Sequence, residues 1–427
     1  MSLVFLWVFL VAMVIGVPVV FALAFGPLVG IFVDGRTVFL NLIPQRLFVG
    51  INVYPLLAIP LFILAGEIMN VGGITQRLID FSQKLVGHLR GGLGHVVIVS
   101  GTVFSGISGS AVADASALGK ILIPSMVREG YHRDYAAAVI AATTVLGPII
   151  PPSIIMVIYA YIMQINVAAL FAAGCIPGLI IGAGLMVANY FVSKRRGYPV
   201  SERRATVREI AVSMKGAFWA LIAPFLILGG ILGGVFTPTE AAAAAVLYAF
   251  IISIFVTREL RWKELPEVLY RTGVISAAIL LVVGTAMIFS WIAGLSGVTA
   301  KVGEFLFSLS SNPYVLLLLV NILLLIAGCF LDAGPAILIL GPILGPTLAQ
   351  LGVDPLHFAL VMCVNLSLGL ATPPMGLLLF VVSAMSRESI MKIAIQMWPF
   401  YLVHLSAILF VTYVPETALW LPRVLGL

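Results

Sequence analysis

Long apolar stretches separated by short polar segments make up most of the chain. Soluble domains carry about 25% charged residues, whereas 9% of these 427 residues are charged and 62% are hydrophobic. A transmembrane helix needs about 20 predominantly apolar residues. The pattern therefore predicts an all-α polytopic membrane protein, with spans in these runs that lack Asp, Glu, Lys and Arg: Met1–Val33, Leu47–Gly66, Tyr135–Ser193, Ala217–Thr239, Thr272–Ala300, Phe305–Leu331, Ala333–Val353, Phe358–Ser386 and Ile393–Pro415.

Two parts of the chain resemble each other. The segment GGITQRLIDF (Gly72–Phe81) resembles SGVTAKVGEF (Ser296–Phe305), and LGPIIPPS (Leu146–Ser153) resembles LGLATPPM (Leu368–Met375). The matching segments follow in the same order and lie 222 to 224 positions apart. Self-similarity at nearly one offset indicates a duplicated unit.

The distribution of Lys and Arg predicts how the two halves lie in the membrane. The most basic segment, residues 194–215, belongs in the cytoplasm by the positive-inside rule. The amphipathic segment Ile74–Leu89 then falls on the cytoplasmic side and Val298–Ser310 on the outer side. A helical hairpin at Gly94–Glu129 would enter from inside, and one at Ser311–Gln350 from outside. We therefore expect an inverted-topology repeat with two re-entrant hairpins, as in many secondary transporters.

Each hairpin has a polar tip, and each is followed by a helix that must break. The tips are SGISGSA (Ser105–Ala111) and GCFLDAGPA (Gly328–Ala336), and the offset of 222 carries Ser110 onto Asp332. Non-helical backbone inside a membrane is tolerated only where it is buried in protein or lines a cavity. The tips are therefore candidate parts of a binding site near the middle of the bilayer.

Proline predicts the two breaks, because it lacks an N–H and clashes with the preceding helical turn. TTVLGPIIPPS (Thr143–Ser153) should break near Gly147 and Pro148, and NLSLGLATPPMG (Asn365–Gly376) near Ala371–Pro374. The result would be two pairs, each formed by a hairpin tip that faces a broken helix.

Such pairs suit small cations, because unwound turns expose carbonyl oxygens and Ser and Thr add hydroxyl oxygens. We expect two or more Na+ sites. The residues expected to form them are Ser105, Ser108, Ser110, Thr143, Thr144 and Gly147 for one site and Gly328, Asp332, Gly369, Ala371 and Thr372 for the other.

Half-helices would also aim their positive N-terminal ends at the middle of the membrane, where they can hold a carboxylate. The expected starts of these half-helices are Ser110, Pro151, Pro335 and Pro373. The residues expected to contact an anionic substrate are Ser108, Ser110, Pro151, Ser153, Thr372 and Pro373.

Structural roles compete with these assignments. Ser and Gly in apolar helices are often close-packing residues, and Asp332 alternatively only caps the helix that follows it. For Asp114 we favour a structural role, as a cap or as a partner of Lys120. Glu67 and Glu240 are likewise expected to be structural.

Signs of enzyme chemistry are sparse, and no enzyme is expected. The sequence GISG (Gly106–Gly109) matches the short GxSG pattern of rhomboid intramembrane serine proteases, but such an enzyme needs a histidine placed as base to Ser108. His404 lies in an apolar helix, and no other rhomboid feature accompanies it. The five histidines show no metal-ligand spacing. The remaining alternative to a transporter is a passive channel, since re-entrant segments also line channels.

Four longer motifs carry a family resemblance. They are PLLAIPLFILAGEIMNVGGITQRL (Pro55–Leu78), FSGISGSAVADASALGKILIPSMVREGY (Phe104–Tyr131), GPIIPPSI (Gly147–Ile154) and ATPPMG (Ala371–Gly376). On these motifs, and over nearly its whole length, the chain resembles the large membrane subunit of tripartite ATP-independent periplasmic (TRAP) transporters.

The resemblance implies a multi-pass protein of the bacterial inner membrane that imports an organic acid, such as a C4-dicarboxylate or sialic acid, driven by Na+. It also implies two partners, a small membrane subunit and a periplasmic substrate-binding protein, which we expect to be separate chains. An elevator mechanism would divide the chain into a moving transport domain and a scaffold. The expected transport domain is residues 94–164 and 312–386, the scaffold is residues 1–93, 165–311 and 387–427, and the linking arms are residues 74–89 and 298–310.

Overall fold

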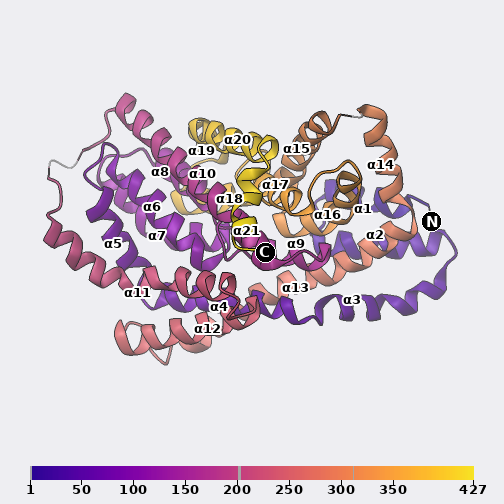
Figure 1. Cartoon of the computed structure of the whole chain (residues 1–427), viewed down its shortest axis with the longest axis horizontal. Helices are drawn as coiled ribbons and strands as arrows, with labels where there is room; N and C mark the ends of the chain where they lie inside the picture. Colours follow the sequence, from indigo (N-terminus) through magenta and orange to yellow (C-terminus); the bar gives the residue numbers. More distant parts are fainter. Residues whose placement is uncertain (1, 201–202, 311) are drawn as a thin grey trace.

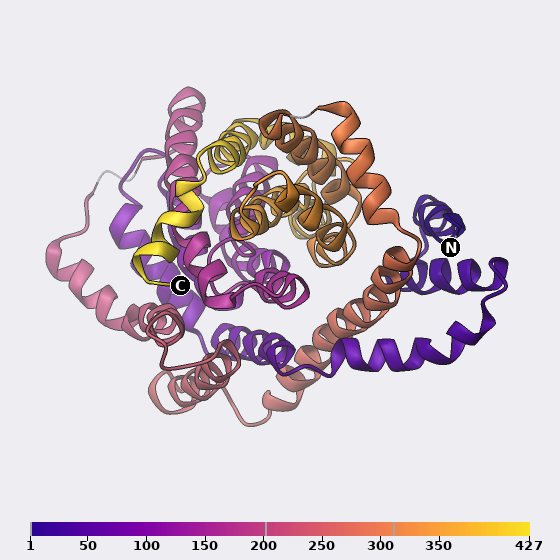
Figure 2. The same ribbon diagram turned by 45° about the vertical axis from the view of Figure 1, so that its right-hand side comes forward.

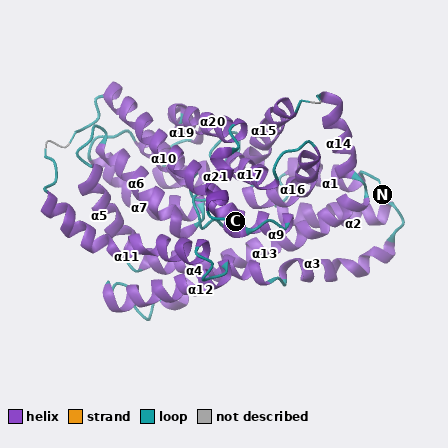
Figure 3. Ribbon diagram, viewed as in Figure 1, coloured by secondary structure: helices purple, strands orange, loops and turns teal. Residues whose placement is uncertain are grey.

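The computed structural model describes residues 2–200, 203–310 and 312–427. Residues 201 and 202 of the basic segment, and residue 311 at one expected domain boundary, therefore lie outside the described residues. The described residues form 21 α-helices and no strand (Figure 3). Seven helices are long and apolar enough to cross a membrane, and a pair bent by 64° makes an eighth if it counts as one span. The predicted all-α polytopic fold is confirmed.

The first part of the chain runs from α1 to α10. A tight turn at Gly16–Pro18 joins the first two helices, and α10 is the long helix that leads into the basic segment. The helices are α1 (Val4–Ile15), α2 (Val19–Val33), α3 (Ile43–Ile51), α4 (Ala58–Val71), α5 (Ile74–Val86), α6 (Gly92–Ser108), α7 (Ala111–Arg128), α8 (Arg133–Thr144), α9 (Ile154–Met163) and α10 (Val167–Arg196).

The second part runs from α11 to α21. Thr237 and Glu240 form a capping box at the start of α12, and Pro238 is the first residue of that helix. The helices are α11 (Val207–Leu232), α12 (Pro238–Ile251), α13 (Leu265–Leu295), α14 (Val298–Leu309), α15 (Pro313–Phe330), α16 (Ala333–Gln350), α17 (Pro355–Gly369), α18 (Leu377–Ser386), α19 (Ile390–Gln396), α20 (Trp398–Tyr413) and α21 (Glu416–Val424).

The series α5–α9 is repeated as α14–α18, which confirms the duplication. In both series an amphipathic helix precedes a hairpin, and the hairpin precedes a helix broken at its Pro-Pro pair. Left-handed backbone recurs at equivalent places: Gly73 and Gly297 precede the amphipathic helices, and Gly130 and Gly352 follow the hairpins. The peptide bonds Pro151–Pro152 and Pro373–Pro374 are both cis.

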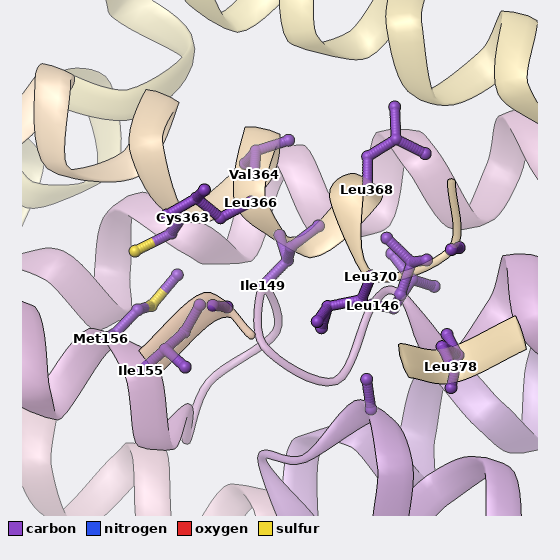
Figure 4. Packing of buried hydrophobic residues seen from close by; sticks show 14 of the residues in the cluster. Leu146, Ile149, Ile155, Met156, Cys363, Val364, Leu366, Leu368, Leu370 and Leu378 are labelled. Carbon is purple, nitrogen blue, oxygen red and sulfur yellow. The ribbon is translucent and has the colours of Figure 1, made fainter. Parts of the chain in front are cut away.

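The two hairpins and two broken helices pack together in the middle of the molecule. Side chains of the two broken helices, among them Ile149, Met156, Cys363 and Leu366, meet in one buried cluster (Figure 4). Helices α1–α3 extend to one side, where α2 and α3 pack along α13 (Figures 1 and 2). Helix α13 also packs against α4 and α16, so it joins this outer group of helices to the second hairpin.

Three of the four expected half-helix starts are displaced. Helix α9 begins at Ile154 rather than Pro151, α18 at Leu377 rather than Pro373, and α16 at Ala333 rather than Pro335. A residue before proline is disfavoured in helical conformation, which keeps the first proline of each Pro-Pro pair in the break. In α16 the Asp332 cap opens the helix before its proline. The start after Ser110 is as predicted.

Candidate functional site

One cavity of about 620 Å³ lies where the two hairpin tips meet. The inner tip contributes Ser108–Ala113, and the outer tip contributes Asp332–Pro335. The remaining wall comes from α4, α6, α7, α9, α13 and α16 and from Pro148, Leu370 and Leu377 near the two breaks. The cavity is therefore built from both copies of the repeat, as the sequence predicts for a central site.

The inner tip is organised around Asp114. Its carboxylate accepts hydrogen bonds from the Ser105 hydroxyl at 2.9 Å and from the Ser108 hydroxyl, and all three side chains are buried. The Ser110 hydroxyl accepts from the Ala113 N–H and caps α7. Of the two structural roles expected for Asp114, a cap or a pairing with Lys120, the pairing is wrong: no ion pair joins the two within the described residues. The hairpin folds α6 back along α7, and this brings the two serines to the carboxylate.

The first broken helix packs directly on this tip. The Ile154 N–H donates to the Gly109 carbonyl at 3.4 Å. A β-carbon at Gly147 would lie 2.9 Å from both Asp114 Oδ2 and the Ala111 nitrogen, so only glycine permits the approach. Ser153 donates to the Pro148 carbonyl at 2.7 Å and caps α9. Tip and break thus form one unit.

The second pair of tip and break is joined by bare backbone. The Gly376 N–H donates to the Cys329 carbonyl at 3.2 Å. A β-carbon on Gly369 would lie 2.5 Å from the Gly328 Cα, so the two glycines allow the helices to touch. The Ala371 carbonyl accepts from the Tyr401 hydroxyl at 2.6 Å.

Asp332 differs from Asp114 in its surroundings. Asp332 lines the cavity with its side chain exposed, and Oδ1 accepts the Ala333 N–H at 2.8 Å. Within the described residues, its Oδ2 accepts no hydrogen bond. The capping role is thus present, and one carboxylate oxygen is open to a ligand in the cavity.

Of the residues predicted from sequence, Ser108, Ser110 and Asp332 line the cavity. The others lie behind its wall, in the tips and breaks. Thr144 and Thr372 donate to carbonyls of their own helices, whereas the buried Thr143 hydroxyl has no hydrogen-bond partner among the described residues. Those that do not line the cavity are Ser105, Thr143, Thr144, Gly147, Pro151, Ser153, Gly328, Gly369, Ala371, Thr372 and Pro373.

Five polar residues of the cavity were missed or assigned only structural roles. Glu67 and Asn70 on α4, Ser116 and Lys120 on α7 and Arg271 on α13 also line it. Arg271 forms an ion pair with Glu267. It lies about two helical turns after a second group of cations, Arg258, Arg261 and Lys263. The cavity therefore extends from the hairpin tips toward the side that the charge distribution assigns to the cytoplasm.

The chemistry of this cavity is that of binding. Within the described residues, no three His, Cys, Asp or Glu side chains are placed to hold a metal together. Ser108 of the GISG motif donates to Asp114, and His404 contacts the Ala142 carbonyl through Nε2 at 3.0 Å. Serine and histidine are thus engaged elsewhere, and the arrangement does not match a nucleophile and its base.

Comparison with known proteins agrees with this geometry. The family model described as "Tripartite ATP-independent periplasmic transporter, DctM component" matches residues 6–417. The chain belongs to this family. It is similar to the sialic acid TRAP transporter large permease protein SiaM of Vibrio cholerae, with 42% identity over 86% of each chain. It is also similar to the C4-dicarboxylate TRAP transporter large permease protein DctM of Pseudomonas aeruginosa, with 40% identity over 88% of this chain and 87% of that one.

A solved structure shares the fold of this TRAP permease. The Alcanivorax borkumensis YdaH transporter superposes with a TM-score of 0.64 at 17% identity, over 89% of this chain and 88% of that one. The relatives are transport permeases rather than enzymes, so the protease alternative is dismissed. The permease is a multi-pass protein of the bacterial inner membrane.

Proposed function

We propose that this TRAP permease imports an organic acid together with Na+ and receives the acid from a periplasmic binding protein. The observation that carries the proposal is the cavity shared by both hairpin tips. A site built from two inverted copies is accessible to alternating sides when the copies exchange conformations. Family membership supports transport itself, whereas the coupling ion, the mechanism and the substrate are our inference.

Two cations and two helix N-termini at the cavity can hold an anionic substrate. Lys120 and Arg271 line it together with Glu67 and Asp332, and helices α7 and α16 begin at its wall. Helix N-termini carry partial positive charge and attract carboxylates. The similarity to permeases for sialic acid and C4-dicarboxylates points to the same chemical class.

Two places suit the coupling cation. In the outer tip, Asp332 offers a carboxylate oxygen beside the unwound backbone of the second break. In the inner tip, Asp114, Ser105 and Ser108 already gather oxygens at one point. Sodium bound at either place would order the tip and complete the anion site, so each ligand would raise the affinity for the other.

An elevator motion is our proposal for alternating access. The expected moving parts, residues 94–164 and 312–386, contain both hairpins and both broken helices, and the arms α5 and α14 link them to the scaffold. Helices α10 and α20 pack against α17 and against each other. This packing favours a moving unit that also includes these two helices.

The proposed partners are a small membrane subunit and the periplasmic binding protein that supplies substrate. The family description names a tripartite system, and this chain would be one of its three parts. The exposed apolar faces of α1–α3, which carry Trp7, Phe21 and Phe48, offer a surface to lipid or to the small subunit.

Uptake by the purified permease and its partners in proteoliposomes tests the proposal. We expect uptake of sialic acid or a C4-dicarboxylate that needs Na+ outside and accumulates substrate against its gradient. Uptake that is unchanged without any cation gradient would refute the coupling. Equilibration without accumulation would instead favour the passive channel.

A further inference from the structure

A second hollow, which we name the arm cleft, lies outside the transport cavity. Its volume is about 230 Å³, and it is lined by Gln83, Lys84, Gly87, His88, Arg203, Arg204, Ala205 and Glu209. These residues come from the end of the arm helix α5 and from the segment before α11 together with its first turn. Helices α5 and α11 pack side by side (Figure 1). The sequence predicts this side to be cytoplasmic.

Cationic groups outnumber carboxylates in the arm cleft. Lys84, Arg203 and Arg204 are exposed there, against the single carboxylate of Glu209. Among the described residues, neither Lys84 nor Arg204 forms an ion pair. Two cations more than 100 positions apart in sequence thus face one hollow without an ion pair of their own among the described residues.

Glu209 is already committed to other partners. Its Oε2 accepts from the Thr206 N–H at 2.7 Å and from the Thr206 hydroxyl at 3.0 Å, which completes a capping box on α11. Its Oε1 pairs with Arg203 at 3.4 Å. This single carboxylate is thus shared between Thr206 and Arg203, and it faces three cations in the arm cleft.

We propose that the arm cleft binds a phosphate group, carried by an anionic lipid headgroup or by a free phosphate. Arg matches phosphate oxygens with paired N–H groups, and Lys adds a point charge. The volume is several times the roughly 30 Å³ that one water occupies, so a phosphate fits. Bound there, it joins the arm α5 to the segment before α11. The site does not depend on the proposed transport function.

Lipid binding to the full chain tests the site. Purified protein is incubated with phosphatidylglycerol or phosphatidylcholine, and native mass spectrometry counts the bound lipids. We expect the double variant Lys84→Ala/Arg204→Ala to bind phosphatidylglycerol about tenfold more weakly, because two surface cations are lost. The matched control is Lys194→Ala/Arg195→Ala, which removes the same charge from the exposed last turn of α10.

A second experiment identifies the source of the phosphate. Inorganic phosphate is added to lipid-depleted protein, and thermal unfolding is followed. Stabilisation of the wild type but not of the cleft variant identifies free phosphate, and selective loss of phosphatidylglycerol identifies the headgroup. Equal losses in the cleft variant and its control would overturn the proposal, as would a cleft variant that matches the wild type with both probes.

Glu209→Gln separates binding from a merely structural role. Glutamine also serves in a capping box, so the start of α11 is kept while a negative charge leaves the cleft. We expect the variant to bind phosphatidylglycerol several-fold more tightly. Unchanged or weaker binding in a folded variant would contradict an anion site.

Discussion

The two hairpin tips share a backbone plan but are held by different chemistry. In the inner tip the buried carboxylate of Asp114 accepts hydrogen bonds from two serine hydroxyls and does not line the cavity. In the outer tip Asp332 faces the cavity, and glycine backbone holds the tip to its break. Duplication therefore kept the fold, while the polar groups diverged. Of the two places proposed for the coupling cation, one would therefore be enclosed within its tip and the other would open to the cavity.

The largest effect is expected at Asp114. Replacement by Asn removes the charge that strengthens two hydrogen bonds, so Na+-dependent uptake should fall by about 100-fold, or about 2.7 kcal/mol in all. Initial rates at several Na+ concentrations measure this. The exposed Asp80 provides the control substitution Asp80→Asn, which should leave uptake unchanged. Normal Na+ dependence in Asp114→Asn would remove the inner tip from the coupling mechanism.

The next effect tests the backbone contact in the outer pair. Gly369→Ala would place its new carbon 2.5 Å from the Gly328 Cα, and overpacking of this kind costs about 1–3 kcal/mol. We expect a lower midpoint of thermal unfolding in detergent. Gly334→Ala, in the outer tip and with no atom within 4 Å of its added carbon, should unfold like the wild type. Equal stability of the two variants would disprove the contact.

A smaller and more selective effect is expected at Asp332. Asn caps a helix about as well as Asp, so Asp332→Asn should keep stability and raise the Na+ concentration for half-maximal uptake by about tenfold, since one open charge is lost. The control is Asp354→Asn, because Asp354 caps α17 and is exposed. If both variants show wild-type Na+ dependence, Asp332 is only a cap.

The smallest effect concerns the starts of the half-helices after the breaks. Ser153 caps α9 through the Met156 N–H at 3.3 Å, whereas α18 begins after Gly376, which provides no side-chain cap. Ser153→Ala should cost about 1 kcal/mol of stability, seen as a modest fall in the unfolding midpoint. Met375→Ala, at the equivalent and exposed position, should change little. A larger loss in Met375→Ala would reverse this part of the comparison.

The fold could be predicted from the sequence because its determinants are local. Apolar runs set the spans, the Pro-Pro pairs set the breaks, and the offset of 222 revealed the repeat. Helix starts were less certain, since a capping residue such as Ser153 competes with the prolines before it. This competition shifted the start of α9 from Pro151 to Ile154.

The site was only partly predictable because its contacts are distant in sequence or hidden by packing. Asp114 and Lys120 are six positions apart and leave a helix in different directions, so Lys120 was a poor choice of partner. The serines reach Asp114 only after the hairpin closes. Lys120 and Arg271 lie on separate helices and meet at the cavity. The distribution of Lys and Arg along the chain predicted the orientation in the membrane, but it could not show that these two residues line the same cavity.

Helix α13 links the cavity to the thickness of the bilayer. Its 31 residues extend about 46 Å at about 1.5 Å each, whereas the hydrocarbon layer is about 30 Å thick. The helix must tilt or protrude, and the amount depends on the lipids around it. Because α13 contributes Arg271, Val274 and Val282 to the cavity wall, longer or shorter acyl chains would reshape the site without contacting it.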